Sequence, residues 1–171
     1  MKKFICLILI LATALLLFSC SKDEEIPENM QLVSTDNVAY RFYVPKAWTV
    51  NSTEIPSAYF SATEKSNVSV TTTPVEDVGT LADYWTKCDE SYKAALTNYQ
   101  QIGEVENVIV DEKNAIKCVY EFKLDGTDYK VMQAFVGNDG YIYSITYTSP
   151  KENYDLRLDE VNNIISVFKF R

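Results

Sequence analysis

The chain of 171 residues contains no histidine, so its candidate reactive groups are carboxylates, cysteine thiols and tyrosine phenols. Without imidazole, nucleophilic catalysis of the Ser-His-Asp or Cys-His type and His-ligated zinc are excluded. Carboxylate pairs remain at Asp111 with Glu112 and at Asp155 with Asp159. Such pairs do acid–base chemistry where burial or a nearby charge perturbs their pKa values. Nothing in the sequence perturbs these pairs, so we interpret them as solvated surface and predict no catalytic residue and no cofactor.

Two cysteines in the globular part of the chain, Cys88 and Cys118, allow two interpretations. Cys88 falls in an amphipathic helical segment and Cys118 on the apolar face of a strand, so the thiols could meet between helix and sheet. In an oxidising compartment, a disulfide would close a loop of about 30 residues and stabilise the fold by roughly 3–4 kcal/mol. Alternatively, both thiols pack as small hydrophobic groups, which is the interpretation that we favour. Redox catalysis is not expected, because the sequence has no Cys-x-x-Cys motif.

Oxygen ligands occur near two predicted turns, at Asp125 with Asp128 and at Asn138 with Asp139. The turns should lie at opposite ends of strands about nine residues long, roughly 30 Å apart at ~3.3 Å per residue. They cannot share a calcium ion, and neither has the spacing of an EF-hand loop. We therefore predict no metal site. The twelve tyrosines mostly fall on predicted apolar faces, which indicates core packing, but tyrosines at strand ends could line a pocket or contact surface.

The first 20 residues have the organisation of a bacterial export signal. A short basic start precedes an apolar run over 4–18, which is too short to span a bilayer comfortably, since that takes about 20 residues. The run ends in LFSC at 17–20, which resembles a bacterial lipobox. The resemblance implies cleavage after Ser19, a diacylglyceryl group on the Cys20 thiol and, often, acylation of the new amino terminus, for example with palmitate. Two or three chains give durable anchoring. The alternative is an ordinary secretory signal with an incidental cysteine.

These features divide the chain into a signal peptide at 1–19, a lipidated, acidic and flexible tether at 20–37, and a globular domain at 38–171. The predicted location is extracytoplasmic and membrane-anchored. In a diderm cell this means the outer membrane or cell surface, and in a monoderm cell the outer face of the cytoplasmic membrane.

The charge balance excludes nucleic acid as a partner. The formal charge is −8, and loss of Lys2 and Lys3 with the leader leaves 14 of 16 basic residues against 24 acidic ones, near −10. Such a surface repels phosphates, and no basic cluster offsets this. A hydrophobic share of 47% is ample for a packed core.

The centre of the chain, 115–148, predicts a meander of three antiparallel strands. Asp125-Gly126 is a strong signal for a two-residue hairpin turn. This turn would place Leu124 opposite Thr127 and Cys118 opposite Gln133, and it would gather one apolar face. That face consists of Ile116, Cys118, Tyr120, Phe122, Tyr129, Val131 and Phe135.

For the second turn we predict a three-residue loop, Asn138-Asp139-Gly140, with Gly140 in the left-handed conformation. A two-residue loop would send three apolar side chains of the third strand to the face opposite Phe135. These are Tyr143, Ile145 and Tyr147. The other face of the meander, which includes Val119, Met132, Ala134, Val136 and Ile142, should be partly covered.

Shorter strands are predicted at 40–44, 46–50, 58–63, 68–73 and 104–110. A helix capped by Thr80 carries an apolar stripe from Leu81 to Tyr99 and ends before Gly103. A second helix should start at Ser149-Pro150. Its stripe is Tyr154, Leu158, Val161, Ile165 and Phe168. The fold class is α+β, a twisted and largely antiparallel sheet flanked by helices.

The segment YRFYVPKAWTV at 40–50 is similar to the F-x-V-P-x-x-W opening of PsbP-like domains. The helix that begins TLADY at 80–84, the meander, and the closing IISVFKF at 164–170 follow in the order of that family. The resemblance covers about 38–171 and implies an α/β/α sandwich of the PsbP/Mog type. The family includes photosystem accessory proteins and bacterial lipoproteins of unknown role, so the fold alone carries no function.

We therefore expect a lipid-anchored accessory or binding protein of the cell envelope, without catalytic activity, that contacts the membrane through Cys20 and has a protein partner in the envelope. Two alternatives stay open. One is a small-molecule-binding protein whose pocket lies between the long helix and the sheet. The other is a carboxylate-dependent hydrolase.

Overall fold

The computed structural model describes residues 25–52, 55–75 and 79–171. The signal peptide and Cys20 lie outside the described residues. The elements in chain order are β1 (Met30–Leu32), β2 (Tyr40–Arg41), β3 (Tyr43–Pro45), β4 (Thr49–Asn51), β5 (Ser57–Tyr59), β6 (Asn67–Pro74), α2 (Leu81–Ala95), β7 (Thr97–Val110), β8 (Lys113–Leu124), β9 (Thr127–Asn138), β10 (Tyr141–Pro150), the 3-10 turn η2 (Tyr154–Arg157), α3 (Leu158–Ser166) and β11 (Lys169–Phe170).

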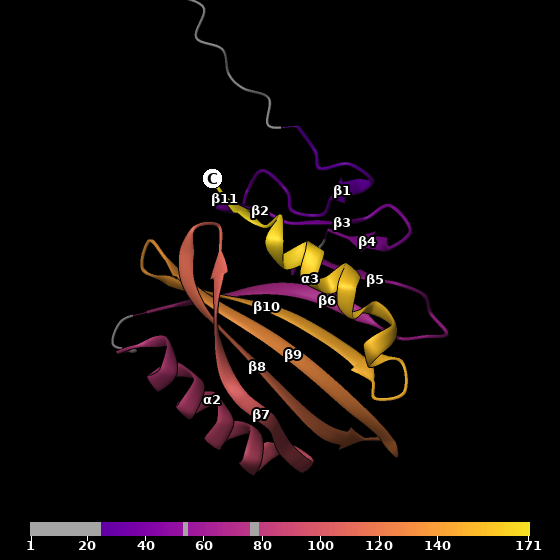
Figure 1. The fold of residues 1–171 in the computed structure, drawn as a ribbon, viewed down its shortest axis with the longest axis vertical. Helices are drawn as coiled ribbons and strands as arrows, with labels where there is room; N and C mark the ends of the chain where they lie inside the picture. Colours follow the sequence, from indigo (N-terminus) through magenta and orange to yellow (C-terminus); the bar gives the residue numbers. More distant parts are fainter. Residues whose placement is uncertain (1–24, 53–54, 76–78) are drawn as a thin grey trace, which may run out of the picture.

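A seven-stranded antiparallel sheet forms the middle of the molecule, in the order β4-β5-β6-β10-β9-β8-β7. Helices α2 and α3 lie on opposite sides of this sheet (Figure 1). The predicted α+β class, with an antiparallel sheet between helices, is confirmed. Of the helices that the structure describes, none is both long and apolar enough to cross a membrane.

Helix α2 covers the first face of the sheet. Thr80 caps it, because its hydroxyl accepts the N–H of Asp83 at 3.2 Å while the Asp83 carboxylate accepts the N–H of Thr80 at 2.8 Å. The predicted apolar stripe of the helix packs onto the predicted apolar face of the meander. The buried members of this cluster, named here the α2 core, are Trp85, Ile116, Cys118, Tyr120, Val131, Phe135 and Ile142.

The second face of the sheet carries the larger core, which α3, η2 and the N-terminal strands cover. Two small two-stranded sheets close this layer, β1 with β3 and β2 with β11. Tyr40 stacks on Phe168 with ring centroids 5.4 Å apart, and Arg171 N–H donates to Ala39 O at 3.1 Å. The segment around β11 therefore packs against β2, on the same side of the sheet as the other N-terminal strands.

The first meander turn is as predicted. Leu124 pairs with Thr127 and Cys118 pairs with Gln133. Asp125 and Gly126 have φ of 49° and 83°, and a type I′ turn requires such positive values at both central positions.

The second meander turn differs from the prediction. Tyr141 pairs with Asn138 across a two-residue turn, in which Asp139 and Gly140 have φ of 47° and 78°. The predicted three-residue loop is therefore wrong. Tyr143, Ile145 and Tyr147 face away from Phe135, and Ile142 joins the α2 core instead of the other face. The physical reason is that both faces of the sheet are buried. Alternate side chains of β10 therefore pack into the α2 core on one face and into the larger core on the other.

The predicted tether is too long at its C-terminal end. Strand β1 pairs with β3, and Met30 and Val33 are buried. Ser34 Oγ accepts the N–H of Phe42 at 3.1 Å. The folded part of the chain therefore begins before residue 38, because these apolar side chains cover the edge of the larger core.

Two helix boundaries also differ from the prediction. Helix α2 ends at Ala95 and β7 begins at Thr97, well before Gly103. The second helical segment begins at Tyr154, not at Ser149-Pro150. The reason is that β10 continues to Pro150, where pairing with β9 outweighs the local signal for a helix start.

Candidate functional site

A hollow of about 550 Å³ opens on the α3 side of the sheet, beside β6 and the start of β10. Four chain segments form it: the turn that leads into β2, the segment before β5, strand β6 and the neighbouring strand β10. Its lining residues are Asn37, Val38, Ala39, Tyr40, Ile55, Pro56, Val70, Thr71, Thr72, Tyr141 and Tyr143. No lining residue carries a formal charge, so the hollow suits an apolar or aromatic group.

Two buried tyrosines, Tyr40 and Tyr143, form the inner wall of the hollow. They are 2% and 3% exposed, and their rings meet edge to face with centroids 5.7 Å apart. Burial, with the neighbouring Tyr143, raises the pKa of Tyr40 to about 12. Burial also raises the pKa of Tyr143, and the nearby Asp139 carboxylate adds to this. Both phenols therefore stay protonated and neutral at physiological pH, able to donate a hydrogen bond but not to act as bases.

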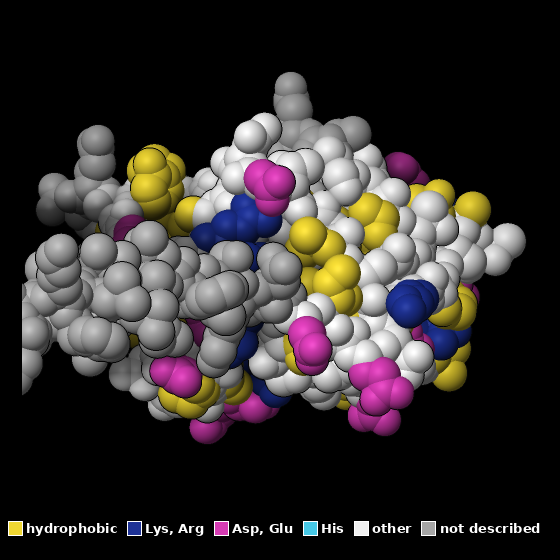
Figure 2. Space-filling model, turned by 90° about the horizontal axis from the view of Figure 1, so that it is seen from above, with side chains coloured by type: hydrophobic (Ala, Val, Ile, Leu, Met, Phe, Trp, Pro, Cys, Tyr) yellow, Lys and Arg dark blue, Asp and Glu magenta, His cyan; other side chains and the backbone are white. Residues whose placement is uncertain are grey.

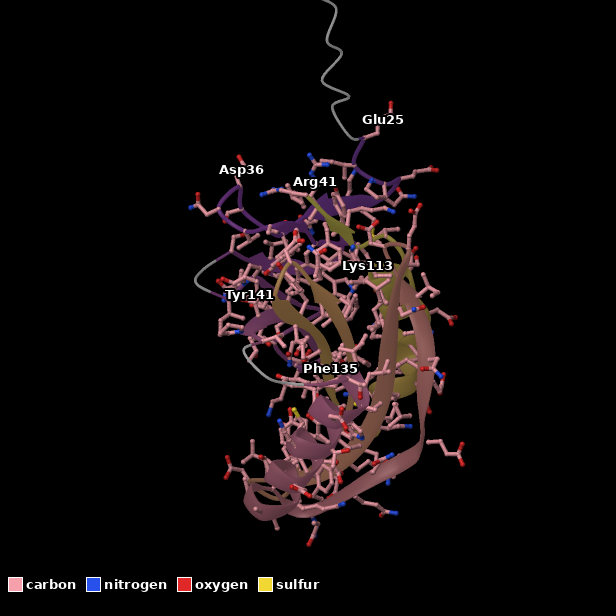
Figure 3. All side chains as sticks on the ribbon, turned by 90° about the vertical axis from the view of Figure 1, so that its left-hand side faces the viewer. Glu25, Asp36, Arg41, Lys113, Phe135 and Tyr141 are labelled. Carbon is pink, nitrogen blue, oxygen red and sulfur yellow. The ribbon has the colours of Figure 1, made fainter. Side chains whose placement is uncertain are left out.

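The rim of the hollow exposes large apolar side chains. Ile55 is 51% exposed and Tyr141 is 46% exposed. Figure 3 shows Tyr141 at the edge of the molecule, whereas Phe135 lies beside α2. Where the face seen from above is not covered by grey atoms, apolar side chains form small separate groups among backbone and other side chains (Figure 2). Large exposed apolar residues around a concave site are typical of binding surfaces.

The structure does not bring the predicted carboxylate pairs into a common site. Asp111 accepts from Lys169 Nζ and from Phe170 N–H, each at 2.8 Å. Burial acts to raise the pKa of Asp111, but the Lys169 and backbone hydrogen bonds outweigh it and hold the pKa below its usual value. Asp155 is 83% exposed and lies 3.9 Å from Lys130 Nζ. An acid catalyst at neutral pH needs a raised carboxyl pKa, and the shifted carboxyls among the described residues are all lowered.

Cys118 belongs to the α2 core and Cys88 packs against it, so both thiols lie between helix and sheet, as the predicted faces required. Both are free thiols, one half-buried and one buried. Burial raises the pKa of each thiol, so neither has the character of a reactive cysteine. The interpretation that we favour, two thiols packed as hydrophobic groups, stays a prediction, and alkylation of the protein from its own compartment tests it.

Aromatic rings pack between α2 and the sheet, where the small-molecule alternative placed its pocket. A smaller hollow of about 330 Å³ lies at the start of α2, between Thr80–Leu81 and the β9–β10 turn. Trp85 contacts Tyr92, Tyr120 and Phe135 with ring centroids 6.0–6.2 Å apart. The two acidic turns lie at opposite ends of β9, and the part of the chain that the structure describes holds no cluster of metal-ligating side chains.

Sequence reasoning missed most of the hollow. Val38, Ile55 and Pro56 lie in stretches without periodicity, so nothing marked them as neighbours. One signal was available, because Tyr141 stands at the first position of a strand and tyrosines at strand ends were expected to line a pocket or contact surface.

The sequence matches no protein-family model, and no curated protein matches it. Solved structures with a similar arrangement exist. LpqN, involved in cell envelope biogenesis of Mycobacterium tuberculosis, has a TM-score of 0.62 at 13% identity over 82% of this chain and 89% of its own. Cyanobacterial PsbP from Synechocystis sp. PCC 6803 has a TM-score of 0.62 at 16% identity over 91% of this chain and 99% of its own. The fold is PsbP-like.

A third structure with this PsbP-like fold is PA94 of Pseudomonas aeruginosa, a protein of unknown function described as a putative regulator. Its TM-score is 0.59 at 15% identity over 81% of this chain and 95% of its own. Identities this low establish a common fold and leave function to the site.

Proposed function

We propose that this chain is a lipid-anchored accessory protein of the cell envelope that binds a protein partner through the hollow and does no catalysis. The observation that carries the proposal is the hollow itself, which is open, uncharged and bordered by exposed Ile55 and Tyr141. The structural likeness to LpqN, a protein involved in cell envelope biogenesis, supports a role in the envelope.

Anchoring follows from the lipobox at 17–20. Cys20 would carry the lipid, and the domain would sit on the outer membrane or cell surface of a diderm cell, or on the outer face of the cytoplasmic membrane of a monoderm cell. The acidic residues after Cys20 would keep the domain away from an anionic lipid surface, since like charges repel.

Anchoring is tested by Cys20→Ala with Cys6→Ala as the matched control, because both cysteines lie in the first 20 residues. Cells are fed an alkyne-bearing palmitate analogue and the protein is followed in membrane and soluble fractions. We expect the wild type and Cys6→Ala to carry label and pellet with membranes, while Cys20→Ala loses both. Label and pelleting that persist in Cys20→Ala would refute lipidation at this residue.

Binding through the hollow is tested by affinity purification of the tagged full chain from its own envelope. Tyr141→Ala alters the rim, and Tyr59→Ala is the control, since Tyr59 is 40% exposed and lies outside the hollow. We expect a stoichiometric partner that Tyr141→Ala loses and Tyr59→Ala retains. Equal recovery with both variants would place the contact elsewhere.

A further inference from the structure

In the part of the chain that the structure describes, the second half of β6 has no neighbouring strand on its β5 side, beside the hollow. Strand β5 pairs with β6 only as far as Ser69, and one further backbone bond joins the N–H of Val70 to Pro56 O at 3.1 Å. Strand β6 itself continues to Pro74, and its other side stays paired with β10 along this stretch. Among the described residues, no strand pairs with Thr71–Pro74 on the β5 side.

The backbone groups that face this open side follow from strand geometry. In an antiparallel ladder, the N–H and C=O of one residue point to the same side and those of the next residue to the other. Val70 N–H points toward β5 and Val75 N–H points toward β10, where it bonds Gly140 O at 2.9 Å. The N–H and C=O of Thr72 therefore point to the open side. The C=O of Val70 faces Pro56, which has no N–H to donate.

The side-chain faces connect this edge to the hollow. Thr72 pairs with Tyr143 across β6 and β10, and residues directly opposite each other share a face of the sheet. A residue of an added strand placed opposite Thr72 would lie on the same face. Its side chain would then enter the hollow beside Tyr143 and Tyr141, both of which line it.

We propose that the edge of β6 at Thr72–Pro74 binds an extended segment of another protein as an added strand, with one apolar side chain of that segment in the hollow. The N–H and C=O of Thr72 and the C=O of Pro74 hold the backbone of the segment, and the tyrosine-lined hollow selects the side chain. This inference rests on the proposed function, because it takes the hollow as the place of binding.

Charge selects the kind of segment. The chain carries a formal charge of −8, so a segment with lysine or arginine around its apolar residue is attracted and a second copy of this chain is repelled. Pro74 at the end of β6 lacks an N–H, which limits the edge to a short pairing and protects it from open-ended association.

The probe is the amidated peptide Lys-Thr-Val-Thr-Phe-Thr-Val-Thr-Lys, titrated into the full chain in detergent by isothermal calorimetry. Thr72→Pro removes the outward N–H at an edge position that tolerates proline, and Thr72→Val keeps this N–H with a side chain of equal shape. We expect the wild type and Thr72→Val to bind alike and Thr72→Pro to bind at least about tenfold more weakly. A peptide with Asp in place of Phe should bind at least about tenfold more weakly to the wild type, because the hollow is uncharged.

A second measurement needs no protein variant. Peptides that each carry a single N-methyl group, moved along successive positions, are titrated into the wild type. The affinity should fall when every second amide is methylated, because alternate amides face β6. Amide hydrogen exchange should show Thr72 protected by the peptide. The proposal would be overturned if the peptide does not bind, or if Thr72→Pro binds it as well as the wild type does. It would also be overturned if the effect of N-methylation does not alternate along the peptide, or if the chain dimerises through this edge without peptide.

The failure of this inference differs from the failure of the proposed function. If the envelope partner is lost with Tyr141→Ala but the peptide does not bind, strand addition is wrong while the hollow remains the contact site. If the peptide binds but the envelope partner is unaffected by Tyr141→Ala, the edge is competent and the proposed function is wrong.

Discussion

Arg157 and Glu64 form a two-point ion pair that joins the turn between β5 and β6 to the helical turn before α3. Arg157 Nε lies 3.1 Å from Glu64 Oε1, and Arg157 Nη2 lies 3.0 Å from Glu64 Oε2. Ser66 also donates to this carboxylate at 2.9 Å, and the guanidinium lies over Phe60, with Cζ 3.3 Å from the ring centroid. Because 93 residues separate the two partners, the pair connects distant parts of the chain.

Arg157→Met should lower the free energy of unfolding by about 2 kcal/mol, since it leaves a half-buried carboxylate without its charged donor. Urea denaturation at neutral pH followed by circular dichroism measures this. The matched control is Lys87→Met on the exposed face of α2, which should change stability by less than about 0.5 kcal/mol. A loss of similar size in both variants would show that the ion pair is energetically unimportant.

Glu64→Gln should make the free energy of unfolding depend less on pH in the acid range. The Arg157 hydrogen bonds hold the pKa of Glu64 below its ordinary value of 4.5. A carboxyl with a lowered folded pKa stabilises the fold above its unfolded pKa and loses that contribution as pH falls through the folded pKa. The free energy of unfolding should therefore fall less between about pH 5 and pH 3 in Glu64→Gln than in the wild type. Glu90→Gln serves as the control, and an unchanged acid slope in Glu64→Gln would contradict the assignment.

The thiols of Cys88 and Cys118 should be slow to react in the folded protein. Alkylation needs the thiolate, and burial raises the pKa of both groups. The protein is treated with iodoacetamide at pH 8, and mass spectrometry counts the alkylated cysteines. Little of the native protein should be alkylated, whereas both residues should be alkylated after unfolding in guanidinium. A Cys88→Ser variant should then show one alkylated site in the domain instead of two. If neither residue reacts after unfolding without a reductant, the two form a disulfide.

Phe135→Ala should lower the free energy of unfolding by about 3–5 kcal/mol, because it leaves a cavity in the α2 core. The ring is 1% exposed and contacts Tyr84 and Trp85 with centroids 5.4 and 6.0 Å away. Leu124→Ala is the comparison, since Leu124 is 53% exposed and should change stability little. Thermal unfolding of the two variants checks the difference.

The hairpin at Asp125-Gly126 could be predicted because turn chemistry and apolar alternation agree locally. The same reasoning failed at Asp139-Gly140. The residue types there favoured a two-residue turn, whereas the assumption of a single apolar face favoured a three-residue loop. The turn residues were the better guide, because the second face of β9 and β10 is buried by α3 and by strands far away in sequence.

The hollow could not be predicted in the same way. Ile55 and Tyr141 are far apart in the sequence, and they line the same hollow because β5 and β10 both flank β6. Strand order in a sheet depends on packing over the whole chain, and no local pattern at either residue reports it. Pairing by alternation predicted which residues share a face, whereas part of the wall of the hollow comes from the irregular segments before β2 and β5.

The pairing of β2 with β11 has a consequence for how the chain is made. Synthesis proceeds from the N-terminus, so Tyr40 and Phe42 emerge long before Phe168, the ring on which Tyr40 stacks. Until α3 and β11 follow, the larger core stays open to water on that side, and such a state is prone to association with other incomplete chains. Completion of the larger core thus waits for α3 and β11 to emerge, and a chain truncated before Phe168 would lack the ring on which Tyr40 stacks.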